Sequence, residues 1–183
     1  AGIGGERRQK IIEMYGFLKQ FVRTTHADFS IDEDTELDGM HFIHTPGHCP
    51  GQVCIMLGDT MLAADHILSQ TTPHQAPESI TAYTGLGHYL DSLRKVAKID
   101  GIALSLGGHE DPVHTVYDRI EAIQQSHERK LNRVLDIIKD TGQPLTIGQI
   151  TEKMYPNKAG YEILLALEEA GAHVEYLYQH GML

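Results

Sequence analysis

The chain has 183 residues, 41% hydrophobic and 22% charged, which is the length and composition of a globular protein with a sizeable core. Its formal net charge of −10 argues against a protein held on nucleic acid by a generally basic surface. No apolar run is long enough to span a membrane, the first residues lack the charged and apolar pattern of a signal peptide, and two cysteines make no disulfide framework. We therefore expect a soluble, cytoplasmic protein without a membrane partner.

The first half of the chain alternates between helical and strand-like patterns. Apolar residues at three- and four-residue intervals predict an amphipathic helix over residues 6–22. Short runs then predict three strands, at residues 40–44, 53–57 and 61–65. Gly58-Asp59 predicts a tight turn that makes the last two strands a hairpin. Helical spacing returns over residues 79–98, with Ser79 as the expected N-cap.

The second half begins with a short apolar run, residues 102–106, which predicts a buried strand ending in Gly107-Gly108-His109. The longest helical pattern follows and stops at Thr141-Gly142. Thr146 and Gln149 have the spacing of a capping box and predict a short helix. A last helix is expected from about Lys158, with its buried stripe at Leu164, Leu167, Val174 and Leu177. The order of elements predicts an α/β sheet domain followed by a small helical module, with a boundary near residue 140.

Three residues that could bind metal end successive strands. His48 lies in a turn that Pro46, Gly47 and Pro50 constrain, and Asp65 and His109 follow the next two strands. Each alone is more often an ordinary turn residue, and it is their order that favours a site. One carboxylate between two imidazoles suits zinc or a similar divalent ion, and the carboxylate has two oxygens with which to bridge two metals. Such two-metal sites are typical of hydrolytic enzymes.

The strings HTPGHCPG, AADHIL and GGHEDPV, in this order, resemble the third, fourth and fifth motifs of the metallo-β-lactamase superfamily over about residues 39–130. The resemblance implies the second half of an αββα sandwich and a metal-dependent hydrolase of a small-molecule substrate, with a metal-bound hydroxide as nucleophile. It also implies two Zn²⁺ ions, or other divalent metals, in an intact site. His48, Asp65 and His109 would be the ligands, and Asp65 would also be catalytic by holding the proton that the leaving group takes.

The strings DHIL, TPH, YLDSL and SHERKL resemble a bacterial branch of this superfamily that carries a winged-helix-like C-terminal module. We therefore divide the chain into a partial hydrolase domain, 1–140, and a winged-helix-like module, 141–183, without the wing. The family's H-x-H-x-D-H string, which supplies the remaining ligands, does not occur, and His26-Ala27-Asp28 is its nearest approach. We expect the chain to be a fragment of a hydrolase and inactive alone.

The alternative is a non-catalytic binding or dimerisation module. Glu162, Glu168, Glu169 and Glu175 make the last helix acidic, and three of them are expected on its exposed face, so we predict no nucleic-acid partner. Packing against the hydrolase domain, or a homodimer, is the favoured use of this helix.

Other polar residues near these motifs have simpler interpretations. We expect His66 to pack or to support the site from the opposite face, His127 to be a buried hydrogen-bonded histidine, and Glu110 to form a loop. Cys49 is expected to be a free thiol near the site, and His44 to lie outside the ligand set.

Overall fold

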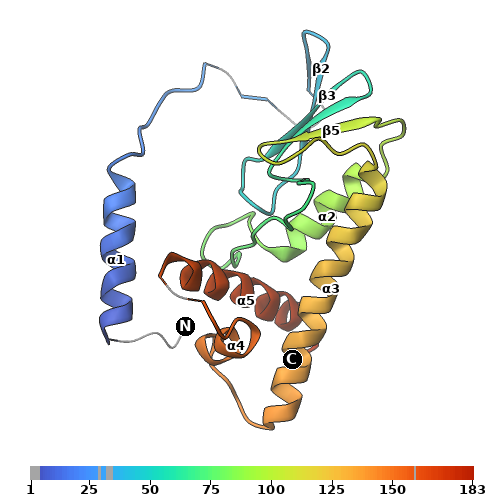
Figure 1. The fold of residues 1–183 in the computed structure, drawn as a ribbon. Coiled ribbons are helices and arrows are strands. Elements are labelled where there is room, and N and C mark those ends of the chain that lie inside the picture. The colour runs from blue at the N-terminus through green and yellow to red at the C-terminus, as the bar shows by residue number, and fades with distance from the viewer. Residues whose placement is uncertain (1–4, 29, 32–34, 159) are drawn as a thin grey trace.

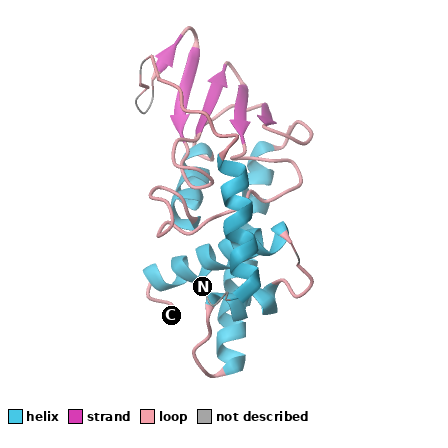
Figure 2. Ribbon diagram, turned by 90° about the vertical axis from the view of Figure 1, so that its left-hand side faces the viewer, coloured by secondary structure: helices cyan, strands magenta, loops and turns pink. Residues whose placement is uncertain are grey.

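Five strands and five helices follow one another in the order that Figure 1 shows for the computed structural model, which describes residues 5–28, 30–31, 35–158 and 160–183. The elements are α1 Gly5–Lys19, β1 Glu36–Leu37, β2 Met40–His44, β3 Val53–Leu57, β4 Thr60–Ala64, α2 Leu86–Val96, β5 Leu104–Gly107, α3 Val116–Thr141, α4 Ile147–Met154 and α5 Tyr161–Gln179. The mixed α/β class predicted from the sequence is confirmed. The sheet lies at one end of the molecule, and α3 runs from it towards the other end (Figures 1 and 2).

The sheet has the strand order β1-β2-β3-β4-β5. The pairs β1–β2, β2–β3 and β3–β4 are antiparallel. The predicted hairpin of β3 and β4 is confirmed, with Gly58 in a left-handed conformation at its turn. β4 and β5 are parallel, and α2 lies in the connection between them. Because parallel strands end at the same edge, the residues that follow β4 and β5 are brought together.

One face of the sheet packs against α2 and α3. Its buried side chains, among them Ile43, Cys54, Met61 and Ala63, form the main core with Tyr89 and other residues of these helices. The opposite face is apolar as well, because Phe42, Ile55, Leu62 and Leu106 stand in register across four strands. Leu62 is 36% exposed and the other three side chains are only half-buried. A sheet that is apolar on both faces is typical of a layer that is covered on both sides.

The C-terminal helices form a second core with the end of α3, built from Val134, Ile137, Ile150 and Leu177. Gly142, in a left-handed conformation, ends α3 as predicted. The capping box is also confirmed: Gln149 N–H donates to Thr146 Oγ1 at 3.3 Å, and Thr146 N–H donates to Gln149 Oε1 at 2.9 Å. The winged-helix character of this helical part stays a prediction.

The expected start of α2 is wrong. The helix begins at Leu86 with Gly85 as its N-cap, instead of at Ser79. The amides of Glu78 and Ser79 donate to the carboxylate of Glu175 at 2.6 and 3.0 Å. Tyr83 and Gly85 have φ 64° and 105°, so the backbone between Ser79 and Leu86 does not run on as a helix. Gly85 N–H donates to the carbonyl of Gly47 at 3.0 Å, which places the start of α2 against the turn that carries His48.

The exposed acidic face predicted for the last helix is also wrong. Glu169 is 7% exposed, the Glu168 side chain is 16% exposed, and Glu175 contacts the loop before α2. These carboxylates are not in solvent because amides and a histidine of residues 74–79 supply partners for them. Leu164 and Leu177 are buried as expected, whereas Leu167 and Val174 are only half-buried. The last helix, α5, begins at Tyr161. Its buried Leu164 and its paired Glu169 lie on different sides, so the helix is enclosed on more than one side.

The predicted N-terminal helix forms but ends at Lys19, and Figure 1 shows it apart from the sheet and from the other helices. Ile12 and Phe17 on this helix are exposed, and so are Phe21 and Val22 after it. Four side chains of the predicted apolar stripe lie outside what the structure describes: Ile11, Met14, Tyr15 and Leu18. Among the described residues, no helix is both long and apolar enough to cross a membrane.

Candidate metal centre

The ends of β4 and β5 form the edge at which the predicted ligands lie. Ala64, the last residue of β4, has φ 45°, a left-handed conformation that a residue with a Cβ seldom adopts. Gly108 N–H donates to the Ala64 carbonyl at 2.8 Å, so the loop after β5 is hydrogen-bonded to the end of β4. Glu110, directly after His109, also has a positive φ, 70°. Backbone strain of this kind gathers at functional sites, where the surrounding structure maintains it.

The structure brings the three predicted ligands together. Asp65 Oδ2 lies 3.7 Å from His48 Nε2, and Asp65 Oδ1 lies 3.9 Å from His109 Nε2. Each carboxylate oxygen therefore faces a different imidazole. Both separations are too long for a hydrogen bond, yet they fall within about 4.2 Å, the sum of two metal–ligand bonds to zinc. The three side chains are between 29% and 57% exposed, so the group is open to solvent. Their role as ligands stays a prediction.

The turn that carries His48 packs directly on α2. Gly47 has φ 138°, and a Cβ at this position would overlap with the backbone of Tyr89. Ser92, one helical turn after Tyr89, donates from its Oγ to the carbonyl of Pro46 at 2.8 Å and fixes the loop that carries His48. Glycine is therefore required at position 47, and the imidazole of His48 projects from a fixed backbone.

A backbone carbonyl sets the tautomer of His48. Its Nδ1 lies 2.7 Å from the carbonyl oxygen of His74, and because a carbonyl only accepts, Nδ1 must carry the hydrogen. In the neutral ring this leaves the lone pair on Nε2, the nitrogen that faces Asp65. Metal-binding histidines usually donate their second ring N–H in this way. The donor set, its spacing and this tautomer fit a divalent cation.

The loop that carries His109 is fastened to a neighbouring loop by Glu110. The carboxylate accepts hydrogen bonds from the amides of Gln70 and Thr71 at 2.7 and 3.2 Å and from Ser69 Oγ at 3.3 Å. Hydrogen bonds from Thr71 and Gln70 lower the pKa of Glu110 to about 2. Glu110 Oε1 is 3.9 Å from His109 Nδ1, too far for a hydrogen bond. Glu110 therefore forms the loop, as the sequence predicted.

Three other histidines near these motifs have structural roles. His44 Nε2 donates to the Pro50 carbonyl at 2.8 Å and closes the turn around His48. His66 is buried and packs edge-to-face on Tyr89, with ring centroids 5.2 Å apart. His127 is buried and hydrogen-bonded to His173 at 3.1 Å, which confirms the interpretation of it as a core histidine.

The neighbouring thiol also has the predicted form. Cys49 is a free, exposed cysteine, and its pKa is raised, first by partial burial and further by the charge of Asp65.

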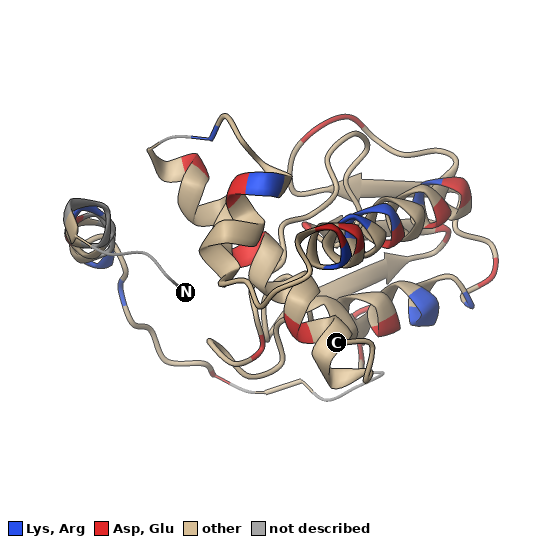
Figure 3. Cartoon of the chain, turned by 90° about the horizontal axis from the view of Figure 1, so that it is seen from below, with Lys and Arg blue, Asp and Glu red and all other residues tan. Residues whose placement is uncertain are grey.

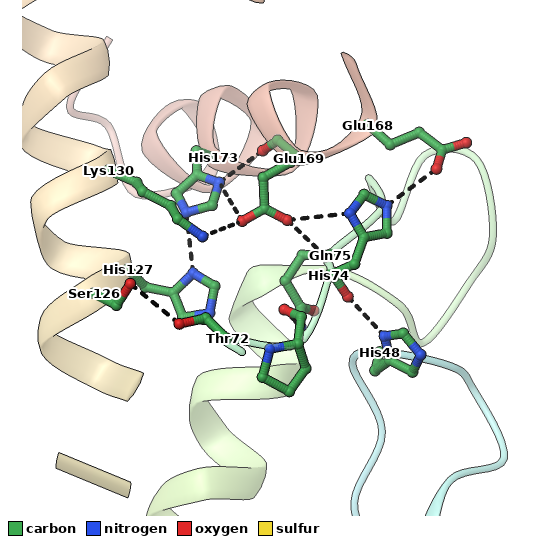
Figure 4. A network of polar contacts seen from close by, with 11 residues as sticks. His48, Thr72, His74, Gln75, Ser126, His127, Lys130, Glu168, Glu169 and His173 are labelled. Atoms are coloured by element: carbon green, nitrogen blue, oxygen red, sulfur yellow. Dashed lines mark hydrogen bonds and ion pairs between the residues drawn. The ribbon is translucent and has the colours of Figure 1, made fainter. Parts of the chain in front are cut away.

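A polar network behind His48, shown in Figure 4, could not be found from the sequence. His74 Nε2 lies 3.1 Å from Glu168, its Nδ1 lies 3.4 Å from Glu169, and Lys130 pairs with Glu169 at 2.7 Å. Burial lowers the pKa of His74, but the two carboxylates outweigh it and raise the pKa to about 9. Burial raises the pKa of Glu169, but His74 and Lys130 outweigh it and hold that pKa well below its usual range. Glu168 is 94 positions from His74 along the chain, so no spacing signal joins them.

The same network contains a second group with metal-binding side chains. Ligand atoms of His127, Glu169 and His173 lie within 4.8 Å of one another, and all three residues are buried. His127 Nδ1 donates to His173 Nε2, since His173 Nδ1 donates to the carbonyl of Glu169 at 2.7 Å. The ammonium of Lys130 already contacts the Glu169 carboxylate and would repel a cation. We therefore interpret this group as a hydrogen-bonded network without metal.

No protein family matches the chain by sequence, and no curated protein matches it either. Solved structures do match. A metallo-β-lactamase family protein from Thermus thermophilus has 24% identity and a TM-score of 0.76, covering 91% of this chain and 54% of that one. A β-lactamase domain protein from Burkholderia ambifaria has 20% identity and a TM-score of 0.74, covering 91% and 51%. The chain therefore has the fold of metallo-β-lactamase family proteins, over about half the length of the chains it matches.

Proposed function

We propose that the chain supplies one part of the two-metal site of a metal-dependent hydrolase. The observation that carries this proposal is the position of Asp65, whose two carboxylate oxygens face the Nε2 atoms of His48 and His109. His48 would hold one metal, His109 the other, and Asp65 would bridge them. The fold of the metallo-β-lactamase family proteins supports the same assignment.

Two bound divalent metals, zinc by the chemistry of the donors, would supply a Lewis acid and a water of lowered pKa for attack on the scissile bond. The residues of this chain have separate tasks. The carbonyl of His74 keeps the hydrogen of His48 on Nδ1, so the lone pair of Nε2 remains available to bind a metal. Asp65, fixed between Ala64 and Gly108, would hold at its carboxylate the proton that the leaving group takes. A small molecule could reach this open edge of the sheet.

We further propose that the site is completed by donors outside this chain. One imidazole and a shared carboxylate give each metal two protein ligands, and a catalytic zinc usually has three. The row of Phe42, Ile55, Leu62 and Leu106 supports this proposal independently, because a second layer would cover that apolar face. On this view the chain corresponds to the second half of an αββα sandwich, and by itself it binds zinc weakly and turns over little substrate.

Zinc titration of the 183-residue chain against a chromophoric chelator tests the proposal. We expect weak binding that Asp65→Ala abolishes, while Asp111→Asn, which alters an exposed carboxylate of the same loop region, leaves it unchanged. Zinc binding that is indifferent to Asp65 would overturn the assignment of the site. Tight stoichiometric binding with turnover of an ester or thioester by this chain alone would instead overturn the proposal that further donors are needed.

The helical C-terminal part is proposed to pack on the hydrolase rather than to bind nucleic acid. Glu168, Glu169 and Glu175 engage the loop before α2, which supports packing within the chain. Acidic and basic residues are interspersed along the sequence of α3, and Figure 3 colours both kinds on the ribbon. Generic duplex DNA at physiological salt is therefore expected not to bind, and a salt-sensitive shift at micromolar concentration would contradict this.

A further inference from the structure

The peptide group between His74 and Gln75 is held from both ends. Its carbonyl oxygen accepts the Nδ1 hydrogen of His48 at 2.7 Å, and its N–H donates to Glu169 Oε2 at 2.8 Å. The peptide group is planar and trans, so its C=O and N–H bonds point in opposite, nearly parallel directions. Fixing the N–H therefore fixes the direction in which the carbonyl meets His48. Figure 4 shows the two contacts leaving the 74–75 segment towards α5 and towards His48.

The contact with Glu169 also changes the strength of the contact with His48. A carboxylate that accepts an amide hydrogen polarises the amide and makes its carbonyl oxygen a better acceptor. The hydrogen bond from His48 Nδ1 is strengthened as a result. More electron density then remains on Nε2, the atom that faces Asp65. The peptide thus transmits the charge of Glu169 to the imidazole.

Glu169 is itself held in one orientation. Its side chain is 9% exposed, and Lys130 Nζ lies 2.7 Å from Oε1, which leaves Oε2 directed at the Gln75 amide. The His74 ring lies 3.4 Å from the same Oε2 and is also paired with Glu168. Lys130 comes from α3 and Glu169 from α5, so both helices aim this carboxylate.

We propose that Glu169 is a positioning residue for the metal centre: through the 74–75 peptide it fixes the tautomer and the orientation of His48. The proposal rests on the proposed metal role of His48, Asp65 and His109. It makes α5 a functional part of the site, although no residue of α5 belongs to the ligand set. Glu168 contacts the His74 ring at Nε2 and serves as the matched comparison.

The test is made first on the metal-free chain, where the histidine tautomers are read from long-range ¹H–¹⁵N NMR spectra. The unaltered chain should show His48 with its hydrogen on Nδ1. Glu169→Gln removes the charge that polarises the peptide and should give a mixture of both His48 tautomers. Zinc affinity should fall about tenfold, the lower end of the effect of residues that support a ligand. Glu168→Gln should leave both measurements unchanged.

Glu169→Gln leaves the ammonium of Lys130 without its partner and could unfold the chain for that reason alone. The double variant Lys130→Met/Glu169→Gln removes both charges together and should show the same change at His48. If the folded variants keep the His48 tautomer of the unaltered chain, the proposed relay from Glu169 through the 74–75 peptide to His48 is overturned, whatever the zinc affinity. If the tautomer changes but zinc binding is indifferent to Asp65→Ala, the relay holds and the proposed metal function fails.

Discussion

Gly108 lies so close to the carboxylate of Asp65 that a Cβ at position 108 would overlap with Oδ1. The methyl group of Gly108→Ala must therefore displace either the carboxylate or the loop that carries His109. Since Asp65 faces both histidines, we expect zinc affinity to fall tenfold or more, on the scale of about 10–100-fold seen when support of a ligand is lost. The measurement is a chelator competition titration.

Gly87→Ala is the control for this substitution. A Cβ at position 87 of α2 would meet only Tyr176 Cδ2, at 3.9 Å, an ordinary contact. Its zinc affinity should equal that of the unaltered chain. Equal affinities for the two variants would show that Asp65 does not have to stay where the structure places it.

The apolar outer row of the sheet should make the isolated chain self-associate. Leu62 lies in the middle of this row, between Ile55 and Leu106, and is 36% exposed. Leu62→Lys should shift sedimentation velocity profiles towards the monomer. Ile80→Lys adds the same charge in the loop before α2, where Ile80 is 64% exposed, and should not. A monomeric unaltered chain at every concentration would refute a homodimer built on this face.

His127 should make the fold sensitive to acid. Burial, helped by the charge of Lys130, lowers the pKa of His127 to about 3, whereas the unfolded chain titrates near 6.5. Above pH 6.5 the residue is neutral in both states. As the pH falls towards 3 only the unfolded state takes up the proton, so this residue lowers the free energy of unfolding by about 1.4 kcal/mol per pH unit.

His127→Gln tests the acid effect, because an amide can still donate to His173 but does not titrate. Glu169 and Lys130, which face this pair, remain in both proteins. The advantage in stability of the unaltered chain over the variant should shrink as the pH falls from 6.5 to about 4 in urea denaturation. A constant difference over this range would mean that His127 does not carry the effect.

Thr146 should stabilise α4 through its side chain. Its Oγ1 accepts the amide of Gln149, so Thr146→Ala leaves that donor without its partner and should cost about 1 kcal/mol of unfolding free energy. Thr146→Ser keeps the hydroxyl and should keep most of the stability. Urea denaturation of the three proteins separates the cap from the loss of a methyl group.

The elements and the candidate ligands were accessible from the sequence because local chemistry determines them. Gly58, Gly142 and the Thr146–Gln149 pair mark turns and caps wherever they lie in a fold. His48, Asp65 and His109 were predicted to meet because each follows a strand, and parallel β4 and β5 end at one edge. These are signals that need no knowledge of distant contacts.

The errors occurred where a partner distant in the chain decides the structure. Ser79 has the residue type of an N-cap, but Glu175, 96 positions later, holds its segment, and the left-handed backbone at Tyr83 delays the helix to Leu86. Glu169 has the residue type of an exposed helix face, but Lys130 and the Gln75 amide enclose it. A pattern of apolar residues reports which side of a helix could be buried, not which charged side chains find partners in the interior.

The long helix α3 belongs to both cores. Val116, Ile120 and Ile123 near its start pack under the sheet, and Val134 and Ile137 near its end pack with α4 and α5. A graft of residues 142–183 onto another protein would leave behind the side chains on which those helices rest. The transferable unit therefore begins inside α3, at Val134 or before it.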